Sequence, residues 1–255
     1  MFKICKYVIY DILRSKVLIA YMLFLLAISC SLFALGNDTA KSVVSLMSVA
    51  LIIVPLISIV FSTTYFYNSY EFIELLVAQP ISRRSLLLGE YAGVAISLAS
   101  VFLAGVGIPV AIYAADATGF VLVGAGLGLT LTFVSLAFLA SVATRDKARG
   151  IGLSLLLWFY FSILYDAIIL IILFSFNDYP LDKAVIALAS LNPIDLSRIM
   201  ILMKMDIAAL MGFTGAVYKQ FFGSSFGLAY VTGLMAIWII VPLLLAVRIF
   251  RKKNI

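Results

Sequence analysis

Long runs without a charged residue are the feature that most constrains this chain. Five such runs lie at 17–37, 42–70, 91–115, 117–144 and 220–247, and a sixth, 151–176, is interrupted only by Asp166. A helix of about 20 apolar residues crosses the roughly 30 Å hydrocarbon layer of a membrane, so each run is long enough to span it. The sequence therefore predicts an all-α membrane protein with six transmembrane helices, in which residues 1–255 form a single transmembrane domain.

The composition is typical of a chain whose solvent is lipid. The sequence is 65% hydrophobic and 12% charged, with a mean hydropathy of +1.19. Soluble domains are roughly 45–50% apolar and 25% charged. A transmembrane β-barrel would instead need alternating segments of about 10 residues, a pattern that the sequence lacks.

Basic residues are divided unevenly between the two ends of the predicted spans. With six spans, both termini share a side with the connectors at 68–90 and 144–150, and that side holds thirteen of the 18 Lys and Arg residues. The positive-inside rule then places both termini in the cytoplasm. We interpret the net charge of +6 as this topology signal and predict no nucleic-acid binding.

Residues 1–16 are predicted to form an amphipathic helix at the inner membrane surface. Two sets of side chains would occupy opposite faces of this helix: Lys3, Lys6, Tyr10 and Arg14 on one, and Cys5, Val8, Ile9 and Ile12 on the other. Such a helix lies in the headgroup layer, where its cations attract anionic lipid. Membrane lipid is therefore a predicted partner.

A short charged helix is predicted between the second and third spans. Asn68, followed three residues later by Glu71, has the form of an N-cap with its N3 acid, and Glu71 and Glu74 would share a face. Gln79 precedes Pro80, which should end the helix. About ten residues are too few for a helix to be stable alone in water. The helix either docks against another protein or lies solvated at the membrane surface.

The largest connector, 177–226, precedes the last span and is extracytoplasmic in this topology. It contains Asn192-Pro193-Ile194-Asp195, in which an Asn cap, a Pro at the first helical position and an acid in the first turn favour a helix start. A helix from 193 to about 211 would carry polar residues on two faces. We therefore predict that it lies partly in the outer leaflet or beneath a partner protein.

Several kinds of catalytic site are excluded by composition. The chain has no histidine, which excludes catalytic triads and histidine-dependent metalloproteases. Its two cysteines, Cys5 and Cys30, provide no disulfide framework, and the absence of a Gly-Lys dipeptide excludes a phosphate-binding P-loop. We predict no catalytic residue, no metal site and no cofactor bound by this chain.

Two features allow more than one interpretation. Asp166 is costly to place within a membrane, so it either packs through hydrogen bonds or binds a proton or cation. Met200 and Met203 cluster with Met205 and Met211. Thioethers suit Cu(I), but methionine is also a common apolar filler of irregular space.

The order of these elements resembles the permease subunits of type-2 ABC exporters. The run ELLVAQPISRRSLLLG at 74–89 is typical of this class. The resemblance implies a homodimer in the bacterial inner membrane and a separate cytosolic ABC ATPase dimer that uses ATP and Mg. It also implies that 68–84 is the coupling helix, which sits in a groove of the ATPase. The residues expected at that contact are Asn68, Glu71, Glu74, Gln79, Pro80, Arg83 and Arg84.

A narrower resemblance rests on LNPIDLSR at 191–198. This motif is similar to one in the permease of the ABC transporter that assembles the copper site of nitrous oxide reductase. The resemblance implies a periplasmic β-helix protein that handles copper and that contacts the 177–226 segment. The residues expected at that contact are Asn192, Pro193, Asp195, Arg198, Met200 and Met203.

Two alternative functions remain open. A type-2 exporter of a drug, lipid or peptide would share the class but need no periplasmic partner. A proton-coupled secondary carrier would use Asp166, although the sequence shows no inverted repeat of the kind that many such carriers have. An intramembrane enzyme is disfavoured because no nucleophile and base are paired.

Overall fold

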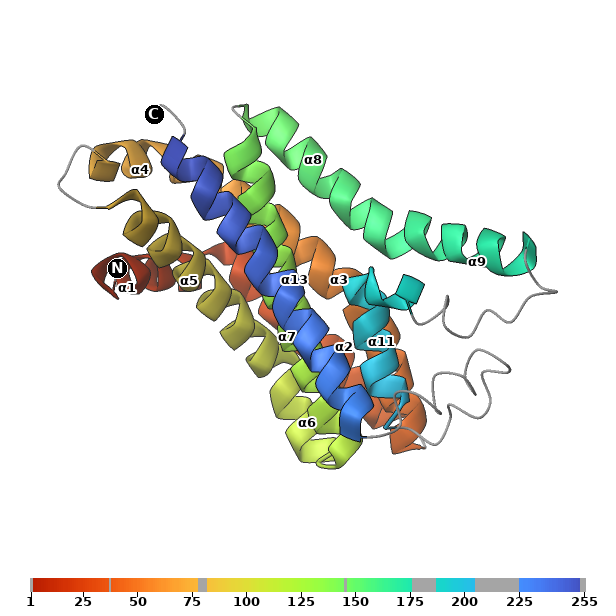
Figure 1. Ribbon diagram of the computed structural model, residues 1–255. Helices are drawn as coiled ribbons and strands as arrows, with labels where there is room; N and C mark the ends of the chain where they lie inside the picture. The colour runs from red at the N-terminus through yellow and green to blue at the C-terminus, as the bar shows by residue number, and fades with distance from the viewer. Residues whose placement is uncertain are drawn as a thin grey trace.

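The chain folds into a bundle of long helices (Figure 1). The computed structural model describes residues 2–36, 38–77, 82–144, 146–175, 187–204 and 225–252. Every regular element in these ranges is helical, and six helical spans are long and apolar enough to cross a membrane. The prediction of an all-α membrane protein with six spans is confirmed.

Two of the six spans contain a π-helical segment (η). The spans are α2 (Lys16–Leu35), α3 (Thr39–Asn68), α5–η1–α6 (Arg83–Phe102, Leu103–Gly107, Ile108–Tyr113), α7 (Ala117–Ala143), α8–η2–α9 (Lys147–Phe159, Tyr160–Leu164, Tyr165–Ser175) and α13 (Ser225–Lys252). Outside these spans lie the shorter helices α1 (Phe2–Leu13), α4 (Tyr70–Val77) and α11 (Pro193–Leu202).

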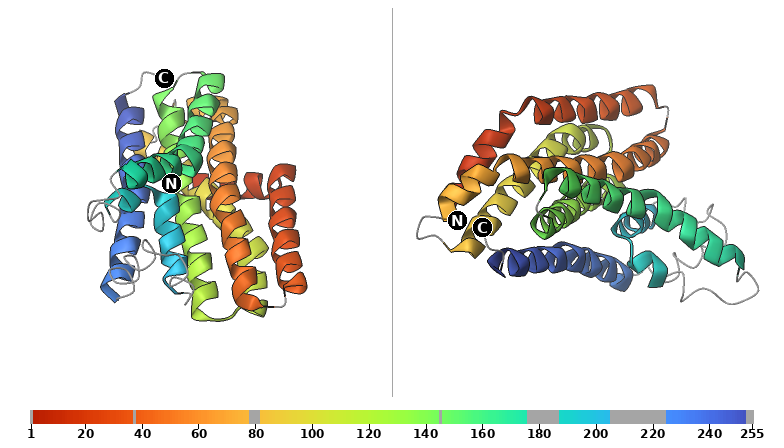
Figure 2. Two further views of the ribbon diagram at one scale, coloured as in Figure 1. Left: turned by 90° about the vertical axis from the view of Figure 1, so that its right-hand side faces the viewer. Right: turned by 90° about the horizontal axis from the view of Figure 1, so that it is seen from above.

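Helix α7 is the centre of the bundle. It is the most buried span, and it packs against α3, α5, α11 and α13 (Figure 2). Small residues allow membrane helices to approach closely, and α7 is rich in Gly, Ala, Ser and Thr. A Cβ at Gly126 would overlap the ring of Phe102 in α5, whereas one at Gly124 would meet nothing within 4 Å. Only Gly126 of this pair is therefore required for packing within the chain.

This difference makes a prediction about stability. We expect Gly126→Ala to lower the melting temperature, because overpacking costs about 1–3 kcal/mol. Gly124→Ala is the matched control. It should leave the melting temperature unchanged or raise it, since Ala is favoured over Gly in helices by up to about 1 kcal/mol. Thermal unfolding of the detergent-purified variants measures both. Equal melting temperatures would contradict the packing assigned to Gly126.

The spans are longer than the charge-free runs predicted. The third span begins at Arg83, directly after its N-cap Ser82, and continues through Glu90, the charge that bounds the run and that is only 1% exposed. The last span continues past 247 to Lys252. Long basic side chains can reach the headgroup layer from a helix end, so a cation there does not end the helix.

Helix α1 packs against α5 as its predicted amphipathicity requires. Ile4, Val8 and Ile12, four residues apart, are buried, and Lys3 and Lys6 are exposed. A Cβ at Gly93 of α5 would overlap Val8, so this glycine sets how closely the two helices approach. The exposed cations of α1 remain available at the surface of the bundle.

Candidate functional site

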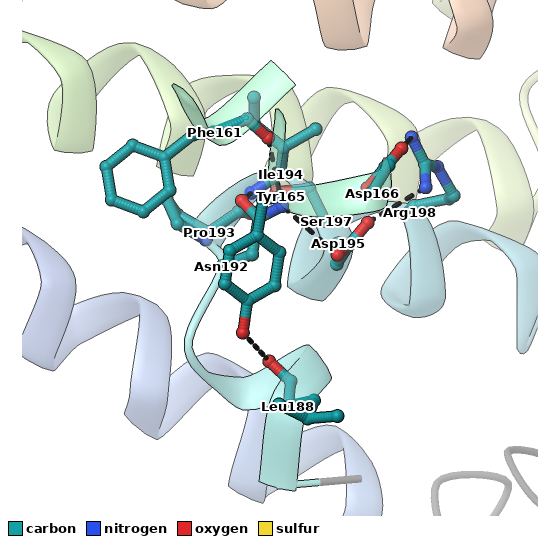
Figure 3. A network of polar contacts seen from close by, with 10 residues as sticks. All are labelled: Phe161, Tyr165, Asp166, Leu188, Asn192, Pro193, Ile194, Asp195, Ser197 and Arg198. Carbon is teal, nitrogen blue, oxygen red and sulfur yellow. Dashed lines mark hydrogen bonds and ion pairs between the residues drawn. The ribbon is translucent and has the colours of Figure 1, made fainter. Parts of the chain in front are cut away.

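Two groups of residues are candidates for function, and they lie in different parts of the bundle. The first, which we term the α4 end, comprises α4, the end of α3 and the start of α8; the end of α13 lies on the same side (Figure 1). The second, which we term the α11 network, joins α11 to the fifth span through polar contacts (Figure 3).

Helix α4 is held against the bundle by apolar contacts. Ile73 is fully buried, and the ring of Phe72 stacks on Tyr7 of α1 with centroids 5.1 Å apart. Leu75 is 69% exposed. Two residues along a helix correspond to about 200° of rotation, so Leu75 points away from the face that Ile73 buries. Helix α4 therefore has a docked face and an apolar residue open to a partner.

The end of α3 is hydrogen-bonded to the α7–α8 turn. The hydroxyl of Tyr67 donates to the carbonyl of Ser141 at 3.2 Å and also bonds Thr144. Lys147 Nζ donates to Asn68 Oδ1 at 2.8 Å. The ring of Tyr67 lies against Gly150, where a Cβ would overlap it. Movement of α4 would therefore be transmitted to α8 as well as to α3.

The predicted capping role of Asn68 is wrong. Asn68 is the last residue of α3, and Ser69 separates it from α4, where the Ser69 carbonyl accepts from the amide of Ile73 at 2.9 Å. The sequence pattern misleads because the side-chain oxygen of Asn68 is engaged by Lys147, 79 residues away. The contact with Lys147, which the sequence does not show, assigns Asn68 to the end of α3.

The remaining predicted residues of the α4 end are placed as follows. Glu71 and Glu74 lie in α4, but the structure does not describe their side chains. Gln79 and Pro80 lie outside the described residues. Arg83 and Arg84 are the first two residues of α5. The sequence prediction omitted Leu75, which could have been found from its position opposite Ile73 on the helix.

Asn192 is the centre of the α11 network. Its Oδ1 accepts from the amide of Ile194 at 3.0 Å, which caps α11 as predicted. Its Nδ2 donates to the carbonyl of Phe161 at 3.0 Å and to Asp195 Oδ2 at 3.1 Å. Phe161 lies in η2, and π-helical segments disturb the regular hydrogen bonding of a helix. Asn192 therefore satisfies a carbonyl near the middle of the fifth span.

Arg198 connects α11 to α9. Its Nη1 lies 2.8 Å from Asp195 Oδ1 and its Nη2 lies 3.1 Å from Asp166 Oδ2 (Figure 3). The intramembrane acid Asp166 thus has a cationic partner 32 residues away, which sequence spacing did not indicate. The arrangement supports the interpretation of Asp166 as a packing residue.

The segment from 187 to 204 lies within the bundle rather than on its surface. Tyr165 Oη donates to the carbonyl of Leu188 at 2.6 Å, and Trp238 Nε1 donates to that of Ser190 at 3.4 Å. Asn192 contacts Phe161, near the middle of the fifth span. The other end of the segment lies at the end of a span, because the Lys204 carbonyl accepts a hydrogen bond from Thr118 at the start of α7. The segment therefore re-enters the bundle, with its polar backbone satisfied by protein.

The length of α11 corrects one expectation. Helix α11 ends at Leu202 rather than near 211, and residues 205–224 lie outside the described part of the structure. Asn192, Pro193 and Asp195 are buried against the chain itself, while Arg198, Met200 and Met203 are partly exposed. Asn192, Asp195 and Arg198 have hydrogen-bond partners inside the chain.

Two of the methionines considered as copper ligands, Met200 and Met203, lie in the described part of the chain. No group of three or more His, Cys, Asp or Glu side chains there is arranged to hold a metal ion. Met200 and Met203 pack against the hydrophobic core. Their contacts are those of apolar filler.

Comparison with known proteins gives the class. The family model described as "ABC-2 family transporter protein" matches residues 4–255, so the chain belongs to this family and is a multi-pass membrane permease of an ABC transporter. Two curated relatives are both named "Probable ABC transporter permease protein NosY". The one from Pseudomonas aeruginosa is 28% identical over 267 positions, covering 96% of this chain and 95% of the relative. The one from Stutzerimonas stutzeri is 25% identical over 275 positions, covering 95% of each.

Proposed function

We propose that this chain is the homodimeric permease of an ABC transporter whose separate cytosolic ATPase acts on α4. The observation that supports this proposal most directly is the exposure of Leu75 on the face of α4 opposite the buried Ile73. Displacing α4 would move α3, and through Tyr67 and Asn68 it would move α8. A nucleotide-dependent shift of this kind requires contacts that differ between two states.

The proposal includes an orientation in the bacterial inner membrane. Among the described cations, Lys3 and Lys6 belong to α1, Arg14 directly follows α1, and Lys147 belongs to the α4 end; the basic end of α13 lies on the same side as the α4 end. By the positive-inside rule this side is cytoplasmic, together with both termini. The ATPase, with its ATP and Mg, would approach from there.

The proposed biological role is copper-site assembly of nitrous oxide reductase. The shared name of the two relatives supports it, as does the Asn192-Pro193-x-Asp195-x-x-Arg198 motif. Because Asn192 and Asp195 are buried, their proposed part is to hold α11 in place. Arg198, Met200 and Met203 are the residues of α11 and its end that we propose for contact with a periplasmic copper-handling β-helix protein.

Affinity purification of the tagged chain from native membranes, followed by mass spectrometry, tests this proposal. Co-elution of an ABC ATPase and a periplasmic β-helix protein is the expected result. An ATPase alone would support the class but favour an exporter of a drug, lipid or peptide. Recovery of the intact chain without any ATPase would overturn the proposal.

A proton-coupled carrier is the alternative that the structure disfavours. Such a carrier needs a carboxyl group free to exchange protons, whereas Asp166 is ion-paired with Arg198 at 3.1 Å. Asp166→Asn should abolish transport by a carrier. In the proposed permease it should leave ATPase stimulation close to that of wild type, because Arg198 keeps its ion pair with Asp195 at 2.8 Å.

A further inference from the structure

A groove of about 790 Å³ lies between α1 and the membrane-facing side of α5. Aromatic and aliphatic side chains of α1 line most of it, with Ile96 from α5 and with Cys5 in its wall. Lys3, Lys6 and Arg14 also line it. The volume lies within the range of about 300–1,000 Å³ that small-molecule sites occupy.

The membrane position of the groove determines what can fill it. Ile96 lies within the third span and is 51% exposed, so the apolar part of the groove opens toward lipid rather than toward another described element. The occupant at this depth must therefore present hydrocarbon. Because Lys3, Lys6 and Arg14 line the same groove, the occupant must also have a polar end.

The charges of the groove require that this polar end be anionic. No carboxylate is among its described lining residues, and the acid of α1, Asp11, accepts from Tyr65 of α3 at 3.2 Å instead. Lys3 and Lys6 are neighbours on one helical face. The guanidinium of Arg14 lies 3.9 Å from the Tyr10 ring centroid and adds positive charge at the other end.

We propose that this groove is a binding site for one anionic phospholipid of the bilayer. The phosphate lies between Lys3 and Lys6, and an acyl chain lies along Cys5 and Ile96. Tyr7 lines the same groove and stacks on Phe72 of α4. If the proposed function holds, lipid occupancy also adjusts the position of α4; the binding itself does not depend on that function.

Native mass spectrometry of the purified full chain tests the binding directly. Dioleoyl-phosphatidylglycerol and dioleoyl-phosphatidylcholine are the two probes. Wild type should retain the anionic lipid at least about tenfold more tightly, and Lys3→Gln/Lys6→Gln should remove that preference, since each cation contributes roughly a fivefold factor. Arg251→Gln/Lys252→Gln removes the same charge from the end of α13 and should change the affinity less than about twofold.

Two further measurements place the lipid in the groove. Ile96→Trp fills the apolar part and should weaken retention of the anionic lipid with every cation intact. Cys5 lines the groove and Cys30 lies in α2, so bound phosphatidylglycerol should slow maleimide labelling of Cys5 relative to Cys30. Equal retention of the two lipids, unchanged binding in Lys3→Gln/Lys6→Gln, or unprotected Cys5 would overturn the proposal. These readouts need no ATPase, so failure of the proposed function would leave them unaffected.

Discussion

Replacing Glu71 and Glu74 by lysine should reduce stimulation of the partner ATPase at least about tenfold while leaving the chain folded. Among the described side chains, Ile73 and the Phe72–Tyr7 pair hold α4 through apolar contacts, and the two substitutions leave those residues unchanged. Reversing both charges at a docked interface creates like-charge contacts, which cost several kcal/mol. ATPase activity of the reconstituted complex is the measurement.

Two controls separate loss of coupling from loss of folding. Glu71→Gln/Glu74→Gln removes charge without reversing it and should give an intermediate loss. Asp146→Lys changes an exposed acid at the N-terminus of α8 that makes no capping hydrogen bond, and it should have less effect than the double reversal. Normal stimulation by a folded Glu71→Lys/Glu74→Lys chain would show that α4 is not the coupling element.

Asn192→Ala should produce the largest loss of stability among the single substitutions considered. It removes three hydrogen bonds and leaves the Phe161 carbonyl and part of Asp195 without a donor in a buried site. Each unsatisfied buried group costs about 1–3 kcal/mol, so we expect a total of about 3 kcal/mol or more. Thermal unfolding in detergent, followed by size-exclusion chromatography, measures the effect.

Asn68→Ala is the matched control, because it makes the same substitution at an exposed asparagine with one hydrogen bond to Lys147. It should cost less than about 1 kcal/mol. Asn192→Asp keeps the oxygen that caps α11 but loses both hydrogen bonds that the Asn192 amide donates. It also adds a buried negative charge beside Asp195, so it should lower the stability at least as much as Asn192→Ala does. If Asn192→Ala and Asn68→Ala destabilise equally, the α11 network does not hold the segment in place.

The sequence alone was sufficient for features that depend on local chemistry. Six spans follow from the lengths of apolar runs, and the α1 faces follow from helical spacing. The start of α11 at Pro193 follows from an Asn-Pro cap. In each case the physical cause lies within a few residues or within one helix, so the pattern is visible along the chain.

Tertiary structure alone decided how the polar residues are used. Asp166 has a partner because α11 re-enters the bundle and brings Arg198 to it, and Asn68 ends α3 with its side chain bound to Lys147. Glu90 is buried although it interrupts an apolar run. These outcomes depend on contacts between residues tens of positions apart. A polar group in a membrane protein must find such a partner wherever the fold places one, and its sequence neighbours do not show where that is.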